Sequence, residues 1–247
     1  MLTEERFSKI LKRLDEKNAV TVLELTELLD TSESTIRRDL TILKNMGKLN
    51  KVHGGATSLS NTFSTEENDV SIKYSLNTEE KTKIAKYAAT LIKSNDFVYI
   101  DAGTSTEAMI EYITEKSAVY VTNGIFLARM LSHKGFQVYV LAGNIKATTE
   151  AIIGSEAVNS LGRYHFTMGF FGAYGIATSG GFSTPDIAEA RIKTEAMSRC
   201  KKSYILSDSS KFGKLSAVTF AELSKAEIIT TTLEDKKYKN YTNVKEV

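Results

Sequence analysis

Small polar residues and glycines gather where an anion could be bound. The segment Asp101-Ala102-Gly103-Thr104-Ser105-Thr106 follows a short apolar run at 97–100 and leads into a helical pattern. Free backbone N–H groups, hydroxyls and the positive end of a helix would therefore meet at this turn, a combination that binds phosphate and other anions. Taken alone, a Gly-Thr-Ser segment is more often only a turn.

Further turns of this kind strengthen the inference. They follow four other predicted strands and comprise Thr122-Asn123-Gly124, Ala142-Gly143-Asn144, Gly172-Ala173 and Asp208-Ser209-Ser210-Lys211. The carboxyl ends of strands in an open parallel sheet share one edge, where ligands usually bind. If the sheet is parallel, the polar turns converge on one site.

A helix that starts at Thr184-Pro185 adds charged groups. Thr184 can cap this helix, and the chain's only proline suits its first position. Asp186, Glu189 and Lys193 are spaced by three and four residues, so they share one helix face and could hold hydroxyls and a phosphate. The plain alternative is that Glu189 and Lys193 form an ordinary surface ion pair.

The elements that must position these groups alternate between strand and helix. Runs of β-branched and aromatic residues predict strands, and apolar residues at helical spacing predict helices between several of them. This alternation predicts an α/β domain with a mainly parallel sheet and helices on its faces. The predicted strands are 97–100, 119–121, 138–141, 166–171, 204–206 and 227–231, and the predicted helices include 78–92, 106–113, 125–131 and 186–200.

The N-terminal part of the chain has a different organisation. Apolar residues recur at helical spacing over 3–17 and again at 22–29, and Ser32 can cap a third helix that ends near Gly47. A short strand at 49–52 with the turn that follows it has the form of a wing. We therefore predict a winged helix-turn-helix.

The predicted domain boundaries follow from this change in organisation. The winged helix-turn-helix would occupy residues 1–56, a linker residues 57–76, and the larger α/β domain residues 77–247. The linker is predicted because Ser, Thr, Asn and Glu dominate its first part with little periodicity.

The third helix carries groups that suit DNA. Ile36 and Leu40 lie on its buried face, so the helix turns its early polar residues outward, where hydroxyl and guanidinium groups can reach base edges and phosphates in a major groove. Residues 32–60 hold five basic and two acidic side chains. The alternative, an ordinary solvated face, is about equally good for a lone three-helix pattern. The outward residues are Ser34, Thr35, Arg37 and Arg38.

Composition limits the other classes of function. The 247 residues include 32 Lys+Arg and 30 Asp+Glu, so the molecule has no strong overall field and any nucleic-acid binding must be local. One cysteine, Cys200, excludes an intrachain disulfide, and the three histidines lack metal-ligand spacing. We expect a structural thiol at Cys200, no metal and no cofactor. No apolar run approaches the ~18 residues that span a bilayer, so we expect a cytoplasmic protein without a membrane partner.

The N-terminal motif resembles the DNA-binding signature of the DeoR family of bacterial transcription regulators. The resemblance is carried by Thr35-Ile36-Arg37-Arg38-Asp39-Leu40, then Leu43, Gly47 and the wing Val52-His53-Gly54-Gly55-Ala56. It implies that Ser34, Thr35, Arg37 and Arg38 face double-stranded operator DNA and that Lys51 and His53 lie on the wing.

The larger domain resembles the DeoR-type effector domain, which is similar in fold to ribose-5-phosphate isomerase and CoA-transferase-like proteins. The resemblance implies a phosphorylated sugar as effector, and Thr122-Asn123-Gly124-Ile125 and 182–189 look most like repressors of fructose operons, whose effector is fructose 1-phosphate. Lys81 matches a family position without an assigned role, and Ala142 replaces a glycine of many relatives, which would narrow the pocket. The expected effector-binding residues are Asp101, Gly103, Thr104, Ser105, Thr106, Thr122, Asn123, Gly143, Asp186, Glu189, Lys193 and Lys211.

Together these features predict a DNA-binding regulator, a repressor of a sugar-utilisation operon, that performs no catalysis. One short recognition helix gives limited affinity, so we expect a homodimer or homotetramer on paired half-sites. The alternative is a sugar-phosphate isomerase-like enzyme with an accessory DNA-binding module. Against it, the fourth predicted strand runs into Gly172-Ala173-Tyr174-Gly175 without the isomerase's acidic pair.

Overall fold

The computed structural model describes residues 3–17, 19–52, 54–57, 62–64 and 70–247. Its contacts divide the chain into two units, Met1–Phe63 with Gly213–Leu215, and Ser64–Phe212 with Ser216–Val247. His53 and much of the expected linker lie outside the described residues. Within the described part of that linker, a short helix, α4 (Val70–Ser75), stands where we expected no regular structure.

The first unit has the predicted three helices, α1 (Thr3–Lys17), α2 (Val22–Leu29) and α3 (Glu33–Asn45). Ser32 caps α3, and its side chain accepts a hydrogen bond from Thr35 N at 3.3 Å. The unit's buried core includes Ile10, Leu25, Ile36 and Leu40. Three short strands form an antiparallel sheet in the order β1 (Ala19–Thr21), β3 (Gly55–Thr57), β2 (Asn50–Val52), so the winged helix-turn-helix is confirmed.

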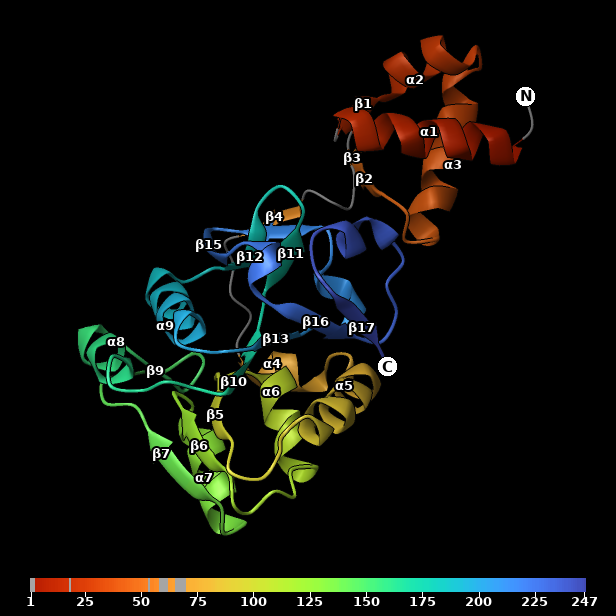
Figure 1. The fold of residues 1–247 in the computed structure, drawn as a ribbon. Coiled ribbons are helices and arrows are strands. Elements are labelled where there is room, and N and C mark those ends of the chain that lie inside the picture. The colour runs from red at the N-terminus through yellow and green to blue at the C-terminus, as the bar shows by residue number, and fades with distance from the viewer. Residues whose placement is uncertain (1–2, 18, 53, 58–61, 65–69) are drawn as a thin grey trace. The chain divides into compact units, whose positions relative to one another are not determined.

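The second unit is built on a seven-stranded sheet in which every neighbouring pair of strands is parallel (Figure 1). The predicted parallel α/β domain is therefore confirmed. The six predicted strands all belong to this sheet, and a seventh strand near the C-terminus was not predicted. In spatial order they are β17 (Val244–Glu246), β16 (Glu227–Thr230), β13 (Ser203–Leu206), β10 (Met168–Gly172), β5 (Phe97–Ile100), β6 (Val119–Thr122) and β7 (Gln137–Val140).

Helices cover both faces of this sheet because successive strand residues point to opposite sides. Val98 and Ile100 of β5 pack with α5 (Thr78–Thr90) and α7 (Ile125–His133). Tyr99 belongs to the opposite cluster, with α8 (Ser155–Leu161) and α9 (Ile187–Ser198). Burial on both faces explains why the strands appear in the sequence as continuous apolar runs rather than as alternating patterns.

Several smaller elements lie outside the seven-stranded sheet. A hairpin of β8 (Asn144–Lys146) and β9 (Ala151–Ile153) precedes α8, and an antiparallel sheet has the order β11 (Gly175–Ala177), β12 (Gly181–Thr184), β15 (Val218–Ala221). Neither was predicted from the sequence. The remaining elements are α6 (Thr104–Glu107), the paired strands β4 (Thr62–Ser64) and β14 (Lys214–Ser216), and the 3-10 helices Ala108–Glu111, Ser209–Lys211, Leu223–Lys225 and Lys236–Asn240. None of the described helices is long and apolar enough to cross a membrane.

Candidate ligand pocket and nucleic-acid interface

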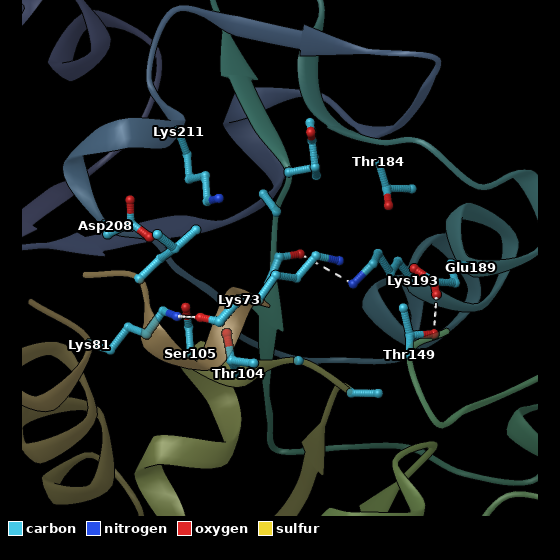
Figure 2. Close-up of a pocket in the computed structure, with 16 residues that line it drawn as sticks. Lys73, Lys81, Thr104, Ser105, Thr149, Thr184, Glu189, Lys193, Asp208 and Lys211 are labelled. Atoms are coloured by element: carbon cyan, nitrogen blue, oxygen red, sulfur yellow. Dashed lines mark hydrogen bonds between the residues drawn. The ribbon is translucent and has the colours of Figure 1, made fainter. Parts of the chain in front are cut away.

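A pocket of about 100 Å³ lies at the carboxyl ends of β5, β10 and β13 (Figure 2). The turns after these three strands contribute to its wall, together with the first turn of α5, the first two turns of α9, the C-terminal end of α4 and the turn between β8 and β9. The lining residues are Lys73, Leu76, Lys81, Ala102, Gly103, Thr104, Ser105, Thr149, Gly172, Ala173, Tyr174, Thr184, Glu189, Lys193, Asp208 and Lys211.

One half of the pocket gathers lysines beside the loop that opens α6. Figure 2 shows Lys81 close to Thr104 and Ser105, with Lys73 and Lys211 also pointing into the cavity. Lys81 Nζ donates a hydrogen bond to the carbonyl oxygen of Lys73. Burial lowers the pKa of Lys81, although the charge of Asp208 acts in the opposite direction. Lysines and the first backbone N–H groups of a helix together form a site for a phosphate group.

Lys211 and Asp208 belong to the same half of the pocket but are held differently. The Lys211 ammonium lies 5.5 Å from the centre of the Tyr174 ring, a cation–π distance. The Asp208 carboxylate accepts hydrogen bonds from Ser210 N and from Asn77 Nδ2, both at 3.0 Å. These contacts fix the loop after β13 to the start of α5.

The other half of the pocket presents groups that suit sugar hydroxyls. Glu189 Oε1 accepts hydrogen bonds from Thr149 Oγ1 at 2.7 Å and from Lys146 Nζ at 3.1 Å. Thr184 and Lys193 line the same side (Figure 2). A carboxylate, hydroxyls and an ammonium group supply both acceptors and donors, which polyol recognition needs.

Lys193 forms an ion pair with Asp101, which follows β5 and is 1% exposed. The Asp101 carboxylate accepts hydrogen bonds from the Lys193 ammonium and from Gly172 N, the latter at 3.1 Å. Burial raises the pKa of Asp101, and the neighbouring Lys193 charge opposes that shift. Asp101 therefore supports the pocket wall and does not line the cavity.

Two other expected effector residues, Thr106 and Asn123, form hydrogen bonds with the backbone of the loop after β5. Thr106 Oγ1 lies 2.6 Å from the carbonyl oxygens of both Asp101 and Gly103, and its side chain is fully buried. Asn123 Oδ1 accepts hydrogen bonds from Tyr99 Oη at 3.0 Å and from Ala102 N at 2.9 Å. These bonds fix the backbone of the loop after β5.

The recognition helix α3 presents the predicted polar residues to solvent. Ser34, Arg37 and Arg38 are exposed and Thr35 is half-buried. Arg37 forms an ion pair of 3.1 Å with Glu33 on the same helix. The polar face of α3 is thus accessible on the described unit.

The wing and the first helix fix α3 at two points. Lys51 Nζ of the wing donates to Thr41 Oγ1 at 2.7 Å, which ties β2 to the helix. Asp39 points inward, where its carboxylate accepts two hydrogen bonds from the Arg6 guanidinium at 2.7 and 3.1 Å. These contacts hold α3 against the wing and against α1.

Comparison with known proteins assigns both units. Residues 6–62 match the DeoR-like helix-turn-helix domain, and residues 76–232 match the DeoR C terminal sensor domain. The chain belongs to the DeoR family of transcriptional regulators.

Relatives of this DeoR-family chain match it along almost its whole length. It is 42% identical over 242 residues to the uncharacterized HTH-type transcriptional regulator FruR of Bacillus subtilis (strain 168), covering 98% of this chain and 96% of the relative. It is 33% identical over 251 residues to the lactose phosphotransferase system repressor of Streptococcus mutans serotype c, covering 99% of each. Among solved structures, ribose 5-phosphate isomerase A of Methanocaldococcus jannaschii aligns over 55% of each chain with 15% identity and a TM-score of 0.40.

In this DeoR-family sensor domain, the expected effector residues fall into two groups. Gly103, Thr104, Ser105, Glu189, Lys193 and Lys211 line the pocket. The other six, Asp101, Thr106, Thr122, Asn123, Gly143 and Asp186, lie outside its wall. Of the five polar turns expected to converge, those after β6 and β7 do not reach the cavity.

Residues outside the wall stabilise the local backbone of turns and helix ends. Thr122 Oγ1 accepts a hydrogen bond from Gly124 N at 3.0 Å, and Asp186 caps α9 by accepting from Glu189 N at 2.8 Å. Gly143 has φ +140°, and a Cβ there would lie 2.5 Å from the carbonyl oxygen of Ile153. Ala142 is not in the wall either, so its methyl group does not narrow this cavity, contrary to our expectation.

Sequence reasoning missed several lining residues. Lys73 belongs to α4, inside the expected linker, and Thr149 belongs to a hairpin that was not predicted. Lys81 and Asp208 were visible as a family position and as part of a polar turn, but neither was assigned to the site. No group of three or more His, Cys, Asp or Glu side chains among the described residues could hold a metal.

Cys200 has the environment of a structural thiol. Its Sγ donates a hydrogen bond to the carbonyl oxygen of Ala196 at 3.1 Å. Burial raises the pKa of Cys200 to about 12. A thiol with that pKa is a poor nucleophile at neutral pH.

Proposed function

We propose that this DeoR-family protein is a cytoplasmic repressor of a sugar-utilisation operon, controlled by a phosphorylated sugar bound in the sensor pocket. The observation that carries the proposal is the two-sided pocket, with Lys81 and Lys211 at one end, Glu189 with Lys193 at the other, and the Lys73 side chain extending between them. A sugar monophosphate has the same polarity, a dianion at one end and hydroxyls at the other.

The effector proposed here is fructose 1-phosphate. Support comes from the resemblance of 122–125 and 182–189 to repressors of fructose operons and from the 42% identity to the regulator FruR. A phosphate against the Thr104–Ser105 turn would meet the α6 N-terminus and the Lys81 ammonium, while ring hydroxyls would meet Glu189, Thr149 and Thr184. The proposed contacts of Asp101, Thr106, Thr122, Asn123, Gly143 and Asp186 with the effector are then indirect.

The first unit would bind double-stranded operator DNA through Ser34, Thr35, Arg37 and Arg38, with Lys51 and His53 from the wing. The exposed face of α3 supports this assignment, because hydroxyls and guanidinium groups are the donors that recognise base edges and phosphates. Paired half-sites would require a homodimer or homotetramer.

We also propose that the protein is not an enzyme. The turn after β10 lines the pocket with Gly172, Ala173 and Tyr174, none of which carries a carboxylate. Glu189 already accepts hydrogen bonds from Thr149 and Lys146, and Asp208 from Asn77 and Ser210. Turnover of ribose 5-phosphate or of a hexose phosphate by the purified protein would contradict this proposal and favour the isomerase-like alternative.

A thermal-shift screen tests the effector assignment. Fructose 1-phosphate, fructose 6-phosphate, glucose 6-phosphate, fructose and inorganic phosphate are compared at equal concentration. A ligand present at about 100 times its dissociation constant adds ~2.7 kcal/mol to the free energy of unfolding, a readily detected shift. We expect the largest shift with fructose 1-phosphate and none with fructose.

A pair of lysine variants makes the screen specific to the pocket. Lys211→Ala removes a lining ammonium and should abolish most of the ligand-induced shift. Lys201→Ala removes an exposed ammonium outside the pocket and should leave the shift unchanged. Equal ligand-induced shifts in both variants would place the ligand outside this pocket. A separate measurement, the release of operator DNA on addition of the stabilising ligand, decides whether that ligand acts as an inducer.

A further inference from the structure

A cluster of exposed and half-buried apolar side chains surrounds the first turn of α7 on the sensor unit. Ile125 and Phe126 of α7 and Ile145 of β8 line a groove of about 360 Å³, together with Arg129 and Glu150. Ile145 is 62% exposed. Single exposed apolar residues are common on proteins, but a cluster that lines a groove and has charged residues at its edge marks an interaction surface.

The groove is separate from the ligand pocket. No residue that lines it belongs to the pocket wall. In β8, Lys146 points toward α9, where it forms ion pairs of 3.1 Å with Asp186 and with Glu189. Because neighbouring strand residues point to opposite sides, Ile145 faces away from the pocket and toward solvent.

Two neighbouring features extend this surface. Tyr74 of α4 contacts Phe126 edge-on, with ring centroids 6.3 Å apart, and is itself exposed. Strand β7, on which α7 packs, is an edge strand of the main sheet, and it exposes Val140 on the side of the sheet where Val138 packs in the α7 cluster. An exposed apolar edge strand is a surface that native proteins normally cover or protect.

We propose that this groove is a two-fold interface with a second copy of this chain. A two-fold interface uses the same patch on both subunits, so it must be self-complementary. The groove carries one cation, Arg129, and one anion, Glu150, beside Ile125 and Ile145. A two-fold axis through it would set each Arg129 against Glu150 of the other copy and bury the four isoleucines together.

The balance of charge favours a second copy over other occupants. A nucleic acid or an anionic lipid surface would be met by a basic excess, whereas the groove pairs one positive with one negative side chain. The choice also rests on the proposed function, because a winged helix-turn-helix on paired half-sites needs a symmetric assembly. The interface would meet that need through the sensor domains.

A charge swap tests the interface directly. The mass of the protein is measured by light scattering and sedimentation, without DNA or ligand. We expect wild type to have the mass of two or four 27.3 kDa chains. Arg129→Glu and Glu150→Arg should each halve that mass and raise the dissociation constant about 10-fold or more, because each substitution acts twice across the axis. The double variant should restore the wild-type assembly.

Two further variants control for folding and for general surface effects. Ile145→Asp should also halve the mass, whereas Tyr241→Asp changes an aromatic residue outside the groove that is 51% exposed and should leave the mass unchanged. Far-ultraviolet circular dichroism and thermal unfolding establish that each variant is folded. A monomeric wild type, unchanged mass in folded single variants, or a double variant that stays dissociated would overturn the proposal.

The outcomes also separate this interface from the proposed function. Operator binding by a protein whose mass is insensitive to all these substitutions would overturn the interface alone. A charge swap that behaves as expected in a protein that binds no operator would uphold the interface and overturn the proposed function alone.

Discussion

Lys193 of α9 and Asp101 at the end of β5 form an ion pair that is almost completely sealed from solvent beneath the ligand pocket. Lys193 Nζ also donates to the carbonyl oxygen of Gly172 at 3.2 Å, and Gly172 N donates to Asp101. The pair therefore joins the loops after β5 and β10 to α9. One charged contact holds three walls of the pocket in place.

Removing one partner of this pair should destabilise the sensor domain strongly. Lys193→Met leaves the Asp101 carboxylate buried without its cation, and such a change typically lowers the free energy of unfolding by about 3–5 kcal/mol. The measurement is urea unfolding followed by fluorescence and circular dichroism. The double variant Asp101→Asn with Lys193→Met should recover much of the loss, because no charge then remains buried. A Lys193→Met protein as stable as wild type would contradict this cost and would mean that the Asp101 carboxylate is neutralised by a proton or reached by solvent.

The lowered pKa of Lys81 predicts a pH dependence of stability. Burial disfavours its ammonium form, so the folded protein binds fewer protons than the unfolded chain between the lowered pKa and the ordinary value near 10.4. The destabilising contribution is fully present below the lowered pKa and is lost as pH rises through this window. Unfolding titrations of wild type and Lys81→Arg should diverge there, since the guanidinium group does not titrate.

The same group predicts proton uptake when a phosphorylated ligand binds. A phosphate dianion beside Lys81 favours the ammonium form and raises its pKa, so complex formation should bind protons in the alkaline range where the free Lys81 side chain is partly uncharged and the phosphate itself is fully ionised. Calorimetric titration in two buffers with different ionisation heats measures this uptake. Lys81→Arg should still bind ligand with no uptake, and equal uptake in both proteins would assign the proton to another group.

Operator affinity should depend on Arg37 in a salt-dependent manner. If Arg37 contacts a phosphate, Arg37→Ala should weaken binding and lower the slope of log affinity against log salt by about 1 per subunit. Fluorescence anisotropy over a range of salt concentrations measures the slope. Arg191→Ala removes the same charge from an exposed position on α9 and should leave the slope unchanged. Identical slopes for Arg37→Ala and wild type would remove Arg37 from the phosphate contacts.

The strands of the sheet and the recognition helix could be predicted because their residues obey local rules. Val98, Tyr99 and Ile100 form one apolar run since both faces of β5 are covered, and Ile36 with Leu40 sets the buried face of α3. The α4 helix has only six residues and sits among polar ones, so no apolar period marks it. Its packing with the sensor domain, including the Tyr74–Glu107 hydrogen bond, is tertiary information.

The pocket was predictable by location but only partly by residue. A polar residue after a strand can face the cavity or the loop beneath it, and the sequence does not distinguish these cases. Ser105 faces the cavity, whereas the amide oxygen of Asn123 accepts hydrogen bonds from Tyr99 and Ala102. Thr149 reaches the pocket from the β8–β9 hairpin. Each strand of that hairpin has three residues, which is too short for an alternating sequence pattern to predict it.

Gly143 separates a backbone requirement from a role in binding. Its φ of +140° is disfavoured for other residues, and a Cβ would lie 2.5 Å from the Ile153 carbonyl oxygen, so Gly143→Ala should lower the free energy of unfolding by about 1–3 kcal/mol. Ligand affinity of the folded fraction should not change, because Gly143 lies outside the pocket wall. Ala142→Gly should leave affinity unchanged for the same reason. Calorimetric titration with chemical unfolding checks both, and a stable Gly143→Ala protein with weakened ligand binding would place Gly143 against the effector after all.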